Sequence, residues 1–87
     1  MEKVLVTFAN GDTIELAEGQ LVIPIGKYEK KGEMFAIKGE VRKLEGYGND
    51  GLIPNVCELF YTCGFFSLVG NERKAYSVSS VVSIEHI

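Results

Sequence analysis

The chain has 87 residues, a net charge of −3 and 46% apolar residues. This length predicts a single domain over residues 1–87, with one compact core. The negative charge argues against a nucleic-acid partner, because such binding depends largely on neutralising phosphates. No apolar run reaches the roughly 20 residues that a membrane-spanning helix needs, and Met1 leads into an alternating strand pattern and not into a signal peptide. The sequence therefore predicts a cytoplasmic protein without a membrane partner.

The first quarter of the chain predicts short strands joined by tight turns. Apolar and other side chains alternate over Lys3–Phe8, and Thr13–Leu16 returns after the hairpin signal Asn10-Gly11. The segment Leu21–Ile25 is apolar on both faces, which is typical of a strand covered on both sides. Because Pro24 lacks a backbone N–H, we expect it at an edge, a bend or a bulge.

A long strand is predicted over Met34–Glu45, after a polar, lysine-rich connection. Its alternation puts Phe35, Ile37 and Val41 on one face, which we expect to point inward. Gly39 belongs to the same face and would allow a bend or a close backbone approach.

A single segment has helical periodicity, and it spans Pro54–Cys63. Pro54 suits the first turn of a helix, and Gly64 suits the position directly after the last helical residue. A helix with one core contact needs an apolar stripe a little over 100° wide, but here only Asn55, Glu58 and Thr62 form a polar strip. Either the helix is sandwiched inside its own fold, or a second chain covers it. The residues that we expect at such a homo-oligomer interface are Leu52, Val56, Leu59 and Tyr61.

The last third predicts three more short strands, Phe65–Val69, Lys74–Val78 and Val81–Ile87. Ser79-Ser80 separates the last two strands. If the alternation of Tyr76 and Val78 continues past it, Val82 and Ile84 point inward. Together with the central helix, these strands predict an α+β fold that is mainly β, built as a small bent antiparallel sheet or barrel.

Two stretches carry a resemblance to known small barrels. The start, Val4 to Asp12, and the end, Lys74 to Ile84, are similar to the first hairpin and the last strands of SH3-like and Sm-like barrels, in which a tight corner joins the last two strands. The resemblance implies an SH3-like barrel with one helix inserted at about 54–63, and it admits Sm-like RNA binding as a distant alternative. Sm-like proteins usually carry their helix before the first strand, and their basic RNA-contacting residues have no counterpart here. The short acidic chain also resembles phage and mobile-element proteins that inhibit a host protein or sequester a ligand.

Residues with catalytic or metal-binding chemistry are few. Cys57 and Cys63 lie about 120° apart on the predicted helix, with Cα atoms too distant for a disulfide, so we expect two buried structural thiols in a reducing compartment. The lone histidine, His86, is the penultimate residue, which favours a surface position. We therefore expect no metal, no cofactor and no enzymatic activity.

The glycine-rich loop before the helix is the strongest candidate site. Gly46, Gly48 and Gly51 would let backbone N–H groups converge next to a helix N-terminus, a known arrangement for binding anions. Asp50 brings a negative charge to the same place, and the spacing lacks the βαβ setting of a dinucleotide fingerprint, so a plain connecting loop is the alternative. The expected ligand-binding residues are Arg42, Lys43, Gly46, Tyr47, Gly48, Asn49 and Gly51.

Two main hypotheses for function follow from these patterns. The first is a self-associating binding protein that captures a small anionic ligand, such as a nucleotide, at the glycine-rich loop. The second is a protein–protein interaction module, an inhibitor or adaptor, that acts through an exposed sheet edge or the wide apolar helix face.

Overall fold

The computed structural model describes residues 2–46 and 48–87. A first antiparallel sheet has the strand order β2-β1-β8 and consists of β1 (Lys3–Phe8), β2 (Thr13–Ala17) and β8 (Val81–His86). The predicted Asn10-Gly11 turn joins β1 to β2, with Gly11 at φ +91° and Asn10 Oδ1 accepting a hydrogen bond from the Asp12 N–H. The local turn signal was therefore sufficient to predict this hairpin.

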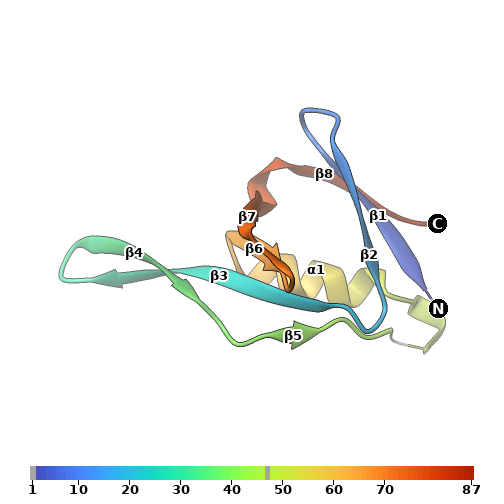
Figure 1. The fold of residues 1–87 in the computed structure, drawn as a ribbon, viewed down its shortest axis with the longest axis horizontal. Coiled ribbons are helices and arrows are strands. Elements are labelled where there is room, and N and C mark those ends of the chain that lie inside the picture. Colours follow the sequence, from blue (N-terminus) through green and yellow to red (C-terminus); the bar gives the residue numbers. More distant parts are fainter. Residues whose placement is uncertain (1, 47) are drawn as a thin grey trace.

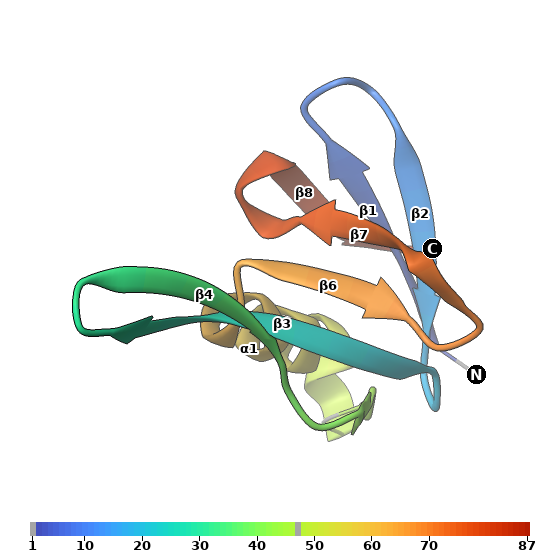
Figure 2. The ribbon, with the colours of Figure 1, turned by 60° about the vertical axis from the view of Figure 1, so that its left-hand side comes forward.

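The second sheet has the order β4-β3-β6-β7 and consists of β3 (Leu21–Lys30), β4 (Glu33–Lys38), β6 (Phe65–Leu68) and β7 (Asn71–Ser77). The two-residue β5 (Arg42–Lys43) also pairs with β3, next to its first residues. A short 3₁₀ turn, η2 (Val78–Ser80), forms the corner expected at Ser79-Ser80 and leads into β8. The sheets curl into a half-barrel beside the helix α1 (Ile53–Thr62) (Figures 1 and 2), which confirms the mainly β, α+β prediction.

The long strand predicted over Met34–Glu45 is interrupted. It forms β4 and β5, which pair with opposite ends of β3. Pro24 lies where the strand beside β3 changes from β5 to β4, and its carbonyl accepts a hydrogen bond from the Gly39 N–H at 2.7 Å. A Cβ on Gly39 would lie 3.2 Å from Pro24 Cγ, so the glycine permits the close approach expected of it. Pro24 thus lies inside the continuous strand β3, opposite Phe66 of β6 and beside the gap between β4 and β5.

The helix agrees with the prediction to within one residue at each end, and it closes the core. Pro54 lies in its first turn, and the extended backbone of Cys63 ends it. Buried side chains from the helix, the loop before it and both sheets form one cluster: Val4, Val6, Phe8, Leu16, Val22, Leu44, Leu52, Val56, Leu59, Cys63 and Phe66. Among them, Phe66 stacks on Phe60 at a centroid distance of 5.1 Å and on Tyr76 at 5.1 Å, and Tyr76 stacks on Phe8 at 5.6 Å. This aromatic row joins α1 to both sheets.

The expected oligomer interface on the helix is wrong for three of its four residues. Leu52, Val56 and Leu59 are each 0% exposed, because both sheets of the same chain cover them, whereas Tyr61 is 93% exposed. The polar strip is also narrower than predicted. Asn55 is buried, and its Oδ1 accepts a hydrogen bond from the Glu45 N–H at 3.0 Å. The helix is therefore covered by its own fold on one side, and Cys57, Glu58, Tyr61 and Thr62 are exposed on the other.

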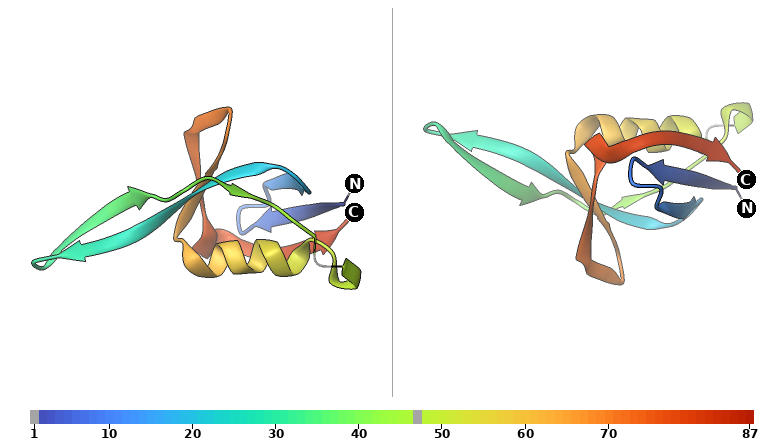
Figure 3. Two further views of the ribbon diagram at one scale, coloured as in Figure 1. Left: turned by 90° about the horizontal axis from the view of Figure 1, so that it is seen from below. Right: turned by 90° about the horizontal axis from the view of Figure 1, so that it is seen from above.

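Two inward-facing predictions for strands fail. Phe35, Ile37 and Val41 are all exposed. Phe35 and Ile37 are exposed because β3 pairs with β6 only as far as Ile25 and the rest of the β3–β4 hairpin projects beyond the helix (Figure 3). Val41 lies outside this hairpin, between β4 and β5. Val82 is exposed because a register shift between β1 and β8 changes the phase of the alternation.

Candidate functional site

Several carboxylates lie beside the glycine-rich loop. Residues Gly48–Asp50 form a short 3₁₀ turn, η1, and Gly51 is buried. A Cβ on Gly51 would lie 2.6 Å from the His86 ring, and one on Gly46 would lie 3.1 Å from Glu2 Oε2. That carboxylate oxygen is buried without a hydrogen-bond partner in the described part of the chain. The glycines therefore make room for neighbouring side chains, and the negative charge disfavours an anion there.

The two cations predicted for the site, Arg42 and Lys43, lie in different surroundings. Arg42 Nη2 lies 3.4 Å from Glu58 Oε1 on the helix and forms a partly exposed ion pair, so its charge is directed away from the loop. Lys43 does reach a cavity of about 530 Å³ beside the loop, but that cavity is also lined by Glu18, Gly19, Glu45 and Gly46. The structure thus brings together Lys43 and Gly46 but not Arg42. Gly48 and Asn49 are exposed, and Tyr47 lies outside the described residues.

The two cysteines have different environments, and neither forms a disulfide. Cys63 is buried as predicted, its thiol donates a hydrogen bond to the Leu59 carbonyl, and burial raises the pKa of that thiol despite the Ile25 backbone and Arg42 nearby. Cys57 is exposed, which corrects the prediction of two buried thiols. Its position toward the outer side of the helix explains the difference, because the sheets cover the other side.

This difference predicts the thiol reactivity of the native protein. Cys57 should react rapidly with an aromatic disulfide reagent, and Cys63 should react at least about a hundredfold more slowly, because its reaction requires local or global opening. Release of the coloured thiolate over time measures both phases. In a Cys57→Ser variant the fast phase should vanish; a fast phase that persisted there would show that Cys63 is accessible.

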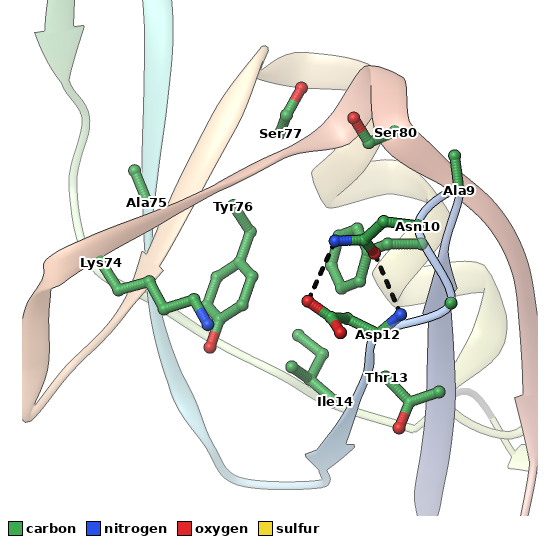
Figure 4. A pocket seen from close by; sticks show the side chains of 12 residues that line it. Ala9, Asn10, Asp12, Thr13, Ile14, Lys74, Ala75, Tyr76, Ser77 and Ser80 are labelled. Atoms are coloured by element: carbon green, nitrogen blue, oxygen red, sulfur yellow. Dashed lines mark hydrogen bonds between the residues drawn. The ribbon is translucent and has the colours of Figure 1, made fainter.

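A second cavity, of about 790 Å³, lies between the β1–β2 turn and β7 (Figure 4). Its lining includes the aromatic ring of Tyr76, with Lys74 Nζ 5.0 Å from the ring centroid. On the opposite side, Asn10 Nδ2 donates to Asp12 Oδ2 at 3.0 Å. Sequence reasoning missed this cavity because it assigned Asn10 and Asp12 only to a turn. Lys74 and Asp12 bring opposite charges to it, so its electrostatics favour neither sign of ligand.

One face of the projecting β3–β4 hairpin carries a row of exposed apolar side chains. Tyr28, Phe35 and Ile37, here called the hairpin face, are 46%, 46% and 48% exposed. Tyr28 lies directly opposite Phe35, with ring centroids 6.5 Å apart, and Ile37 lies opposite Gly26. All three side chains point to the same side, because successive residues of a strand alternate between its two faces.

The turn of this hairpin fixes its register. Lys31 and Gly32 both have positive φ, +53° and +79°, which is the pattern of the two-residue turn whose twist matches that of the flanking strands. Lys30 therefore lies opposite Glu33, and the apolar residues are held in one row. Every residue of β4 is exposed, and among the described residues the only strand beside β3 beyond Ile25 is β4.

Comparisons with known proteins identify no relative: no protein-family model, no curated protein and no solved structure matches this chain. Among residues 2–46 and 48–87, no group of three histidine, cysteine or acidic side chains could hold a metal ion. Over the same ranges, none of the helices is both long and apolar enough to traverse a bilayer. The case for a function therefore depends on the surfaces described above.

Proposed function

We propose that this protein is a non-enzymatic protein–protein interaction module that binds its partner through the hairpin face. The observation that carries the proposal is the half-exposed row of Tyr28, Phe35 and Ile37 on a ribbon that projects from the core. Aromatic side chains beside an open strand edge are typical of protein-binding surfaces, in which backbone hydrogen bonds and side-chain pockets act together.

The energetics of the ribbon support a covering partner. A two-stranded hairpin is at best marginally stable in water by itself, and within residues 2–46 and 48–87 the residues of β3 after Ile25 pair with β4 alone. Covering apolar surface contributes about 25 cal/mol per Å². A partner on the hairpin face would thus stabilise both the complex and the ribbon.

Capture of an anionic ligand at the glycine-rich loop has less support. The buried oxygen of Glu2 and the carboxylates of Glu18 and Glu45 surround the place where the anion would bind, and Arg42 is paired with Glu58. The exposed, unbridged Cys57 fits the cytoplasm, where thiols stay reduced, and we place the protein there.

The experiment compares Phe35→Glu with Val82→Glu, because both introduce a charge at an exposed apolar strand position, 46% and 63% exposed. Each tagged variant is cross-linked in source cells and its bound proteins are quantified by mass spectrometry. We expect the wild type and Val82→Glu to retain the same partner, and Phe35→Glu to reduce it at least about tenfold, since a charge at the centre of an apolar contact is costly to desolvate. Equal retention by all three proteins would contradict the proposal.

A further inference from the structure

The open edge of β4 has backbone groups that are available for pairing. The hydrogen bond from the Gly39 N–H to the Pro24 carbonyl identifies that opposed pair as a hydrogen-bonded one. Because hydrogen-bonded and non-hydrogen-bonded pairs alternate along antiparallel strands, Ile37 and Phe35 direct their N–H and C=O groups toward β3. The backbone groups of Met34, Ala36 and Lys38 must then point away from β3, at the free edge.

We propose that a second copy of this chain occupies that edge, with the two β4 strands pairing antiparallel about a two-fold axis perpendicular to the sheet. Such an axis keeps the hairpin face of both copies on one side of a four-stranded sheet. This inference rests on the proposed function, because pairing at the β4 edge would join the hairpin faces of two copies into one binding surface.

One register satisfies both the backbone and the side chains. It places Ala36 opposite the second copy's Ala36 and Met34 opposite its Lys38, and each of these pairs exchanges two backbone hydrogen bonds. On the hairpin face, Phe35 then lies opposite the second copy's Ile37, an aromatic–β-branched pair that stabilises sheets. A register centred on Phe35 would instead put Ile37 opposite the second copy's Glu33. It would also put the outward backbone groups of Lys38 opposite the second copy's turn, where no strand residue pairs with them. The first register is therefore favoured.

One pair of opposite charges supports this arrangement. The tip carries Lys31, among Glu29, Lys30 and Glu33, and the base of β4 is followed by Glu40. Antiparallel pairing brings the tip of one copy beside the base of the other, with Gly32 opposite the second copy's Glu40. Lys31 of each copy, next to Gly32 in sequence, thus comes near Glu40 of the other at both ends of the contact, which favours the antiparallel arrangement.

A proline at Ala36 tests the backbone contact, because it removes an outward N–H and leaves the bonds to β3 intact. The matched control is Glu15→Pro, at another exposed position on an edge strand, β2. The Phe8 N–H donates a hydrogen bond to the Asp12 carbonyl, so Phe8 and Asp12 form a hydrogen-bonded pair. By the same alternation, the backbone groups of Glu15 point away from β1. In sedimentation velocity we expect the wild type and Glu15→Pro to be dimers, and Ala36→Pro to raise the dimer dissociation constant at least about tenfold. A wild type that is monomeric at its highest soluble concentration, or an Ala36→Pro variant with unchanged dimerisation, would overturn the inference.

A cross-link tests the register and remains informative if Ala36→Pro fails to fold. In a Cys57→Ser background, Ala36→Cys should form a disulfide-linked dimer under mild oxidation, because Cα atoms of a hydrogen-bonded pair lie about 5.5 Å apart, within disulfide range. Glu15→Cys in the same background should remain a monomer on a non-reducing gel. A dimer that does not cross-link through Cys at position 36 contradicts the pairing. If the wild type is monomeric and Phe35→Glu nevertheless loses another protein, the interaction function stands and self-pairing fails.

Discussion

Replacing Phe66 by alanine is expected to destabilise the protein by roughly 3–5 kcal/mol, the range for truncating a buried phenylalanine. Phe66 is 0% exposed and stacks on both Phe60 and Tyr76. Its removal would leave a cavity between the helix and the sheet and would interrupt the aromatic row. Because small domains are stable by only about 5–15 kcal/mol in total, the variant should be partly unfolded at physiological temperature.

The neighbouring residue provides a matched control for this substitution. Phe65 has the same side chain on the same strand but is 45% exposed, so Phe65→Ala should cost less than about 1.5 kcal/mol. Urea unfolding followed by circular dichroism gives the free energy of unfolding of both variants. Similar losses for the two variants would show that the aromatic row is not the centre of the core.

Gly51→Ala is expected to cost about 2 kcal/mol or more for two separate reasons. Gly51 has φ +70°, a conformation that costs a residue with a side chain about 1–2 kcal/mol. In addition, the new Cβ would lie 2.6 Å from the His86 ring and 3.3 Å from Glu2 Oε2, so the ring must move. The free energy of unfolding should fall by the sum of both effects.

Gly48→Ala separates the two causes, because Gly48 also has a positive φ, +53°, but a Cβ there meets nothing within 4 Å. It should therefore cost only the backbone part, about 1–2 kcal/mol. Adding His86→Ala to Gly51→Ala should recover the steric part, and a double-mutant cycle measures the coupling. Equal costs at both glycines, with no coupling to His86, would refute the packing role that we assign to Gly51.

The elements that the sequence predicted well are those specified by neighbouring residues. Asn10-Gly11 marks a hairpin by its conformational freedom, and Pro54 with the apolar period predicts the helix to within one residue. The candidate site was predicted less well. Arg42 lies just before the glycine-rich loop in sequence, but its guanidinium pairs with Glu58, 16 residues away. Electrostatic partners of this kind depend on how elements pack, which no local pattern contains.

The amino-acid sequence by itself determined the helix, the first hairpin and most of the short strands, because backbone preference and apolar period are properties of residues close along the chain. It did not predict that β3 continues to Lys30 or that the strand expected over Met34–Glu45 divides into β4 and β5. Only the tertiary structure decided which apolar side chains are buried. Leu52, Val56 and Leu59 are apolar residues of the kind found at interfaces, but both sheets of the same chain cover them. Phe35 and Ile37 alternate as in a strand of the core, but they remain exposed. The physical reason is that burial depends on what lies across from a side chain, and the segments across from it are distant in sequence.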